Sequence, residues 1–107
     1  MKSCETEIIF LKEAFIITYC SHCERIGMLF GQSMLSFHVN DFSAFCRYVE
    51  RMDFESHHSP FFDGISRIIL ETYHMDIQIS LKEEEFNTLR KHLYETQLRL
   101  RIYNSLN

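Results

Sequence analysis

Two stretches of this chain repeat one arrangement, in which an alternating apolar and polar segment leads directly into an amphipathic helix. In residues 33–39, Leu35, Phe37 and Val39 alternate with polar residues, which is the period of a strand with one buried face. Asn40 then offers a helix N-cap. The apolar residues after it recur at helical spacing: Phe42, Phe45, Cys46, Val49 and Met52. This change of period predicts a strand-to-helix unit for which the rest of the chain must supply packing partners.

A second strand-to-helix unit is predicted further along the chain. Residues 76–81 repeat the alternation, and Ser80 with Glu83 has the spacing of a capping box. The core face of this helix consists of Phe86, Leu89, Leu93, Thr96, Leu100 and Tyr103. Residues 98–107 leave two interpretations open. We favour helix to Arg99, but apolar residues alternate with arginines there, as in a strand.

The two units share a register. Leu35 corresponds to Ile79 and Phe42 to Phe86, with a constant offset of 44 residues. The offset suggests a duplicated ββα unit, although any two strand-to-helix segments would share part of this pattern.

Further strands are predicted from short apolar runs rich in isoleucine and phenylalanine. They form three hairpins, in residues 7–19, in residues 25–39 with a turn at Gly31, and in residues 65–81. Residues 53–64 have the composition of a loop. We therefore expect an α+β fold with an antiparallel sheet of five or six strands and two helices on one face.

Length and charge restrict the class of protein. The 107 residues suit one domain, and we take residues 1–107 as that domain. A net charge of -4 offers no general attraction for phosphate, so nucleic acid is not an expected partner. No apolar run reaches the roughly 18 residues that a membrane span requires, and charges interrupt the N-terminal apolar segments. We expect a soluble, cytoplasmic protein.

The most specific chemical signal is Cys20 and Cys23, a C-x-x-C pair at the tip of a predicted hairpin. Such a pair can direct two sulfurs toward one Zn²⁺, but a structural zinc site needs four ligands. The residues that could complete it are His22, His38, His57 and His58, or a second subunit could supply another pair.

Two other interpretations of the cysteine pair remain. A reversible disulfide is one, but redox pairs usually precede a helix whose dipole lowers the thiol pKa, and here a strand follows. The favoured interpretation is two thiols at a turn without a chemical role. Cys46 lies in the apolar stripe of its helix and is predicted to be a core residue. The sequence offers no candidate catalytic residues and no cofactor motif.

The order of several motifs resembles a family of small uncharacterised domains from Bacteroidetes. The motifs are Tyr19-Cys20-x-x-Cys23, Leu29-Phe30, Leu35-x-Phe37, Asp41-Phe42-x-x-Phe45 and Glu85-Phe86-x-x-Leu89. The resemblance covers residues 8–93 and implies a cytoplasmic bacterial protein and a domain of this size. It implies no catalytic residues.

These observations favour a non-enzymatic interaction or regulatory module. The long final helix and the ten phenylalanines suggest more apolar surface than one small domain leaves exposed, so we expect a homodimer or another protein partner. The alternative is a zinc-binding or thiol-redox protein centred on Cys20 and Cys23.

Overall fold

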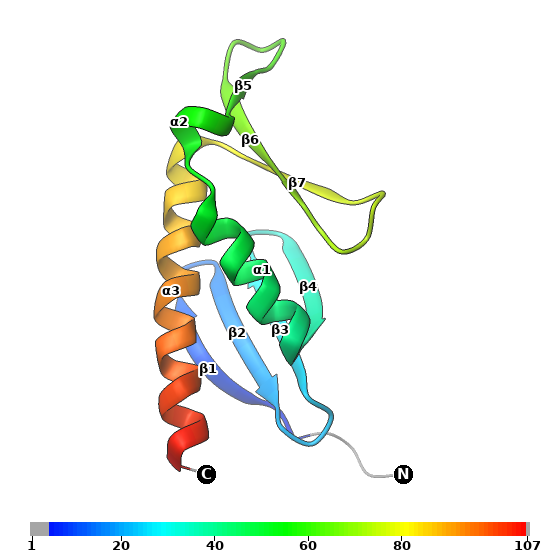
Figure 1. The fold of residues 1–107 in the computed structure, drawn as a ribbon, viewed down its shortest axis with the longest axis vertical. Coiled ribbons are helices and arrows are strands. Elements are labelled where there is room, and N and C mark those ends of the chain that lie inside the picture. Colours follow the sequence, from blue (N-terminus) through cyan, green and yellow to red (C-terminus); the bar gives the residue numbers. More distant parts are fainter. Residues whose placement is uncertain (1–4, 107) are drawn as a thin grey trace.

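The computed structural model describes residues 5–106 and has an α+β fold with seven strands and three helices (Figure 1). In chain order the elements are β1 Glu7–Lys12, β2 Phe15–Cys20, β3 Arg25–Phe30, β4 Ser33–His38, α1 Val39–Arg51, α2 Phe54–His57, β5 Ser59–Pro60, β6 Ser66–Glu71, β7 Gln78–Leu81 and α3 Glu83–Leu106. The molecule is elongated, with extents of 49 × 28 × 23 Å.

The first sheet is a meander of two predicted hairpins, with strand order β1-β2-β3-β4 and antiparallel pairing throughout. The turn between β3 and β4 has Gly31 at φ 60, the position at which a type II′ hairpin places glycine. The turn between β1 and β2 has no glycine, and Ala14 adopts φ 52 instead. A non-glycine residue pays a steric penalty in this left-handed region.

The expected single sheet of five or six strands is wrong in one respect, because the described residues form two sheets. The second has the order β5-β6-β7, and β7 does not pair with β4. After β4 the chain crosses the first sheet as α1, and β6 and β7 then form beyond the end of that helix (Figure 1). The two predicted ββα units, β3-β4-α1 and β6-β7-α3, are therefore present in separate sheets.

The helices also differ from expectation in number and in their caps. A short third helix, α2, and the two-residue strand β5 lie in the predicted loop. The first helix begins at Val39, and its N-cap is His38 rather than Asn40. The last helix begins at Glu83. Ser80, the predicted start of its capping box, belongs to β7 instead. There the Glu85 carboxylate accepts a hydrogen bond from the Lys82 backbone N–H at 2.8 Å.

The final helix continues to Leu106, so the strand interpretation for its end is wrong. Its predicted face is confirmed: Phe86, Leu89, Leu93 and Thr96 are buried, and Leu100 and Tyr103 are half-buried. Within residues 5–106, no helix is long and apolar enough to cross a membrane.

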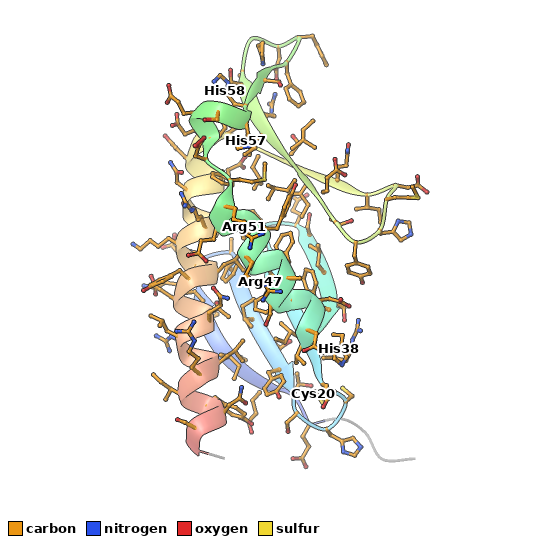
Figure 2. The ribbon with its side chains drawn as sticks, in the orientation of Figure 1. Cys20, His38, Arg47, Arg51, His57 and His58 are labelled. Atoms are coloured by element: carbon orange, nitrogen blue, oxygen red, sulfur yellow. The ribbon has the colours of Figure 1, made fainter. Side chains whose placement is uncertain are left out.

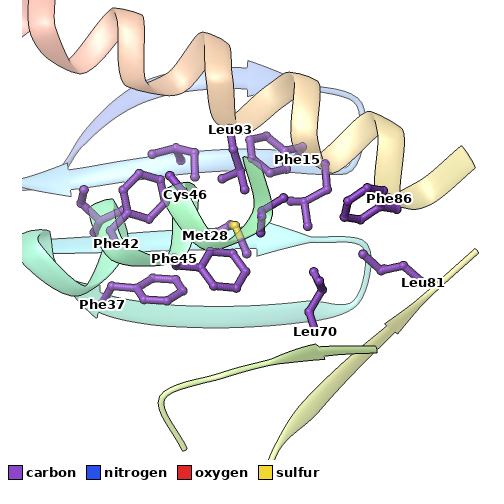
Figure 3. Packing of buried hydrophobic residues seen from close by; sticks show 14 of the residues in the cluster. Phe15, Met28, Phe37, Phe42, Phe45, Cys46, Leu70, Leu81, Phe86 and Leu93 are labelled. Atoms are coloured by element: carbon purple, nitrogen blue, oxygen red, sulfur yellow. The ribbon is translucent and has the colours of Figure 1, made fainter. Parts of the chain in front are cut away.

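One hydrophobic core joins both sheets. Helices α1 and α3 cover the same face of the first sheet, and α3 also contacts β6 and β7 (Figures 1 and 3). The fully buried large side chains are Phe10, Phe15, Ile17, Ile26, Met28, Phe37, Phe42, Ile68, Leu70, Phe86, Leu89 and Leu93. The Phe37 ring lies 5.6 Å from Phe42 and 5.3 Å from Phe45, as centroid distances. These rings hold α1 against β4.

Candidate functional site

The cysteine pair lies at the β2–β3 hairpin, as predicted, with Cys23 in the turn and Cys20 at the end of β2. Cys20 is the last residue of β2 and only 3% exposed, whereas Cys23 is exposed and is a free thiol. The two side chains therefore occupy different environments. Cys46 is buried in the core as predicted, and burial raises the pKa of its thiol to about 12. The fourth cysteine, Cys4, lies outside the described residues.

The candidate completing ligands are spread along the molecule. His22 shares the exposed turn with Cys23, but His57 and His58 lie at α2, at the opposite end of the long axis from Cys20 (Figure 2). There the His57 Nδ1–H donates to the backbone oxygen of Asp53 at 2.9 Å, and the His58 ring stacks on Phe54. Among residues 5–106, no three His, Cys, Asp or Glu side chains gather closely enough to hold a metal ion.

His38 has a structural role that the sequence did not reveal. Its Nδ1 accepts a hydrogen bond from the backbone N–H of Asn40 at 3.1 Å and so caps α1. The other ring nitrogen, Nε2, must then carry the proton, and it donates to the Glu24 carboxylate at 3.1 Å. In the sheet register, Arg25 lies between Cys20 and His38. The positive charge of the Arg25 guanidinium at that position would repel a metal ion bound by both Cys20 and His38.

A cleft of about 940 Å³ separates the facing edges of the two sheets. One wall is the β4 edge with the turn before it, and the other is β7 with the turn before it. The start of α3 closes one end. At the other end the Tyr73 hydroxyl donates to the backbone oxygen of Ser36 at 2.9 Å. The volume lies within the range of ligand-binding clefts in proteins.

The face of the first sheet that α1 and α3 leave uncovered carries two contrasting rows of side chains. The strand register places Leu11, Ile16, Leu29 and Met34 in one row across the four strands, and Ile8, Thr18, Gly27 and Ser36 in the next. The first row is a ridge of large apolar residues. The second row, here called the groove, has smaller residues on β2, β3 and β4 and Ile8 at its β1 end.

Sequence reasoning missed both surfaces, but one signal of the open face was present. The segments of β1, β2 and β3 read EIIFLK, FIITYC and RIGMLF, so they are apolar at most positions on both faces. Strands of that kind are usually covered on both sides. Within residues 5–106, helices α1 and α3 cover only one side of these strands.

The comparisons with known proteins give one result. A family model described as a family of unknown function (DUF6686) matches residues 1–105. No curated protein and no solved structure matches the chain.

Proposed function

We propose that this chain, which belongs to the family of unknown function DUF6686, is a non-enzymatic interaction module that works as a homodimer in the bacterial cytoplasm. One observation carries the proposal, namely the apolar ridge on the open face of the first sheet. In the ridge, Leu11 is 62% exposed and Met34 is 74% exposed, and Ile8 in the neighbouring row is 62% exposed. Clustered exposed apolar side chains of this kind usually mark an interaction surface.

The two rows support a second copy as the partner because they complement each other. A two-fold axis lying between the rows and parallel to them would place each ridge over the groove of the other copy. Leu29 would then lie over Gly27 of the second copy, and Leu11 over Ile8. Gly27 matters most for this approach, because it adds no side chain of its own. The Thr18 hydroxyl and the end of the Met34 side chain lean toward this position and would have to turn aside in the dimer.

The size of the face sets the expected strength of the dimer. Four strands about 4.8 Å apart, each of six residues rising about 3.4 Å, give a face of roughly 400 Å² per copy. The two copies together would bury roughly 800 Å², which lies below the lower end of stable specific interfaces, about 1,200 Å² in total. We therefore expect a dimer with micromolar affinity rather than an obligate one.

Sedimentation equilibrium across a concentration series tests the proposal. Leu11→Glu places a charge within the ridge and is expected to weaken dimerisation at least about tenfold. Ile102→Glu is the matched control, because Ile102 is 60% exposed on α3, outside the proposed interface. The control should dimerise like the unmodified protein.

Two results would contradict the proposal. A protein that stays monomeric at high micromolar concentration has no such dimer. Loss of the dimer in Ile102→Glu but not in Leu11→Glu would show that the interface is instead the exposed stripe of α3. That stripe contains Tyr94, Leu98 and Ile102.

A further inference from the structure

We propose that the cleft between β4 and β7 binds an extended segment of a partner protein, which adds as a strand to the free edge of β4. The site goes beyond the homodimer, since the edge of the sheet and its open face are different surfaces. The expected ligand alternates apolar and polar residues and carries a lysine or arginine at one end.

The backbone of β4 supplies the first part of the argument. Strand β4 is an edge strand, and the Ser36 carbonyl faces the cleft, because it accepts the Tyr73 hydroxyl from across it. In an antiparallel ladder, residues alternate between bonding to the neighbouring strand and facing away from it. Met34 therefore presents its backbone N–H and C=O to the cleft in the same direction as Ser36. Such an edge is a ready template for another strand.

The side chains of the cleft supply the second part. On the core side of the β4 edge, the cleft is lined by Phe30, Leu35, Ile79 and Leu81, of which Leu81 is buried and the other three are half-buried. Alternate side chains of an added strand would point to this apolar floor, and the remaining ones to solvent. The cleft thus suits a strand that is apolar at every second position.

The charge at one end supplies the third part. Glu13 and Glu84 line the cleft where α3 begins, and both are exposed. Glu85 lines the same end, but its carboxylate is engaged with the Lys82 backbone N–H. Two available carboxylates favour a cationic side chain on the ligand, which also fits the net charge of -4.

Selection from a phage-displayed library of random linear heptapeptides tests the inference on the full chain carrying Leu11→Glu. This background removes the proposed dimer face, so failure of one proposal can be told from failure of the other. We expect enrichment of peptides with alternating apolar residues and a terminal lysine or arginine. Synthetic versions of the enriched peptides are then titrated in solution.

Two matched comparisons identify the site. Glu84→Lys should weaken binding about tenfold, whereas Glu83→Lys, in the same helical turn but outside the cleft, should not. Because both changes place a cation in the first turn of α3, they carry similar folding costs. A peptide methylated at alternate backbone nitrogens keeps its side chains but loses strand pairing, so it should bind at least about tenfold more weakly.

Three outcomes would overturn the inference. They are the absence of any enriched peptide, equal binding by the Glu84→Lys and Glu83→Lys proteins, and undiminished binding of the methylated peptide. Circular dichroism of each variant confirms that a lost signal does not reflect unfolding.

Discussion

The Tyr73 hydroxyl donates a hydrogen bond to the Ser36 carbonyl at 2.9 Å, and so joins the turn after β6 to the edge of β4. The Tyr73 ring also lies 6.0 Å from that of Phe37, as a centroid distance, although the residue is 68% exposed. This contact links the two sheets across the cleft and ends the cleft at Ser36.

Tyr73→Phe keeps the ring and removes only the hydroxyl. Because water can reach the Ser36 carbonyl in its place, we expect the free energy of unfolding to fall by only about 0.5–1 kcal/mol. The freed carbonyl can accept from an added strand, so enriched peptides should bind more tightly. Urea unfolding and peptide titration measure the two effects. Tyr94→Phe is the control, since Tyr94 is exposed on α3 outside the cleft, and it should change neither quantity.

Gly27 and Thr18 are expected to be energetically coupled. A Cβ atom at Gly27 would lie 2.7 Å from the Thr18 hydroxyl oxygen, so Gly27→Ala alone should destabilise the protein by about 1 kcal/mol. In a Thr18→Ala background the obstacle is gone, and alanine avoids the entropic cost of a mid-strand glycine. The same substitution should then be neutral or stabilising. Additive effects in a double-mutant cycle by urea unfolding would contradict this coupling.

His92 should make stability depend on pH. Its ring lies 5.3 Å from Phe10 and 5.0 Å from Phe15, as centroid distances, and its buried Nδ1 has no hydrogen-bond partner among the described residues. Burial lowers the pKa of His92 from 6.5, with Glu95 opposing this shift and Lys12 and Lys91 adding to it. Below about pH 6.5, His92 therefore binds a proton more readily in the unfolded chain than in the folded protein.

The contribution of His92 to stability is fully present above pH 6.5 and is lost as the pH falls toward its lower folded value. His92→Leu should flatten the decline in unfolding free energy as the pH falls below about 6.5, and denaturant titrations at a series of pH values measure it. Hydrogen bonds from the backbone N–H groups of Ser56 and Ile65 also lower the pKa values of Asp53 and Asp63, respectively, but these carboxylates titrate below their ordinary value of 3.8. An unchanged slope in His92→Leu would contradict the assignment.

The cysteines should differ sharply in reactivity. Cys23 is an exposed free thiol, whereas Cys46 is buried with a pKa raised to about 12. Alkylation follows the exposed thiolate, so iodoacetamide at pH 8 should label Cys23 quickly and Cys46 only after denaturation. Peptide-resolved mass spectrometry separates the sites. Labelling of Cys46 at the rate of Cys23 in native protein would contradict the packing of α1.

Native protein with unmodified thiols tests the zinc alternative. Native mass spectrometry of protein never exposed to chelator should show a metal-free mass under the interaction proposal. A stoichiometric zinc that is lost in Cys20→Ser would instead support the metal site, with ligands from a second subunit or from outside the described residues.

Local elements of the fold were predictable because their signals are local. The period of two after Gly31 and the helical spacing after Asn40 correctly predicted β4 and α1, and the seam of α3 was confirmed. The N-cap at His38 was missed, because histidine is an uncommon cap and Asn40 stands two residues later.

The arrangement of the sheets and the candidate sites were not predictable, because they depend on contacts between distant segments. Alternation in β4 and β7 shows which face of each strand is buried, but not whether the strands pair. The cleft exists because they do not pair. The open face likewise depends on which side of the first sheet α1 and α3 occupy.

The position of α3 in chain order has a consequence for synthesis. All four strands of the first sheet leave the ribosome before α3, yet Phe10 and Phe15 lie against the α3 residue His92. Until that helix emerges, the aromatic face of the nascent sheet has no cover from it. Exposed apolar strands of this kind are prone to aggregate. The strands of the first sheet are therefore open to aggregation from the time β4 leaves the ribosome until α3 does.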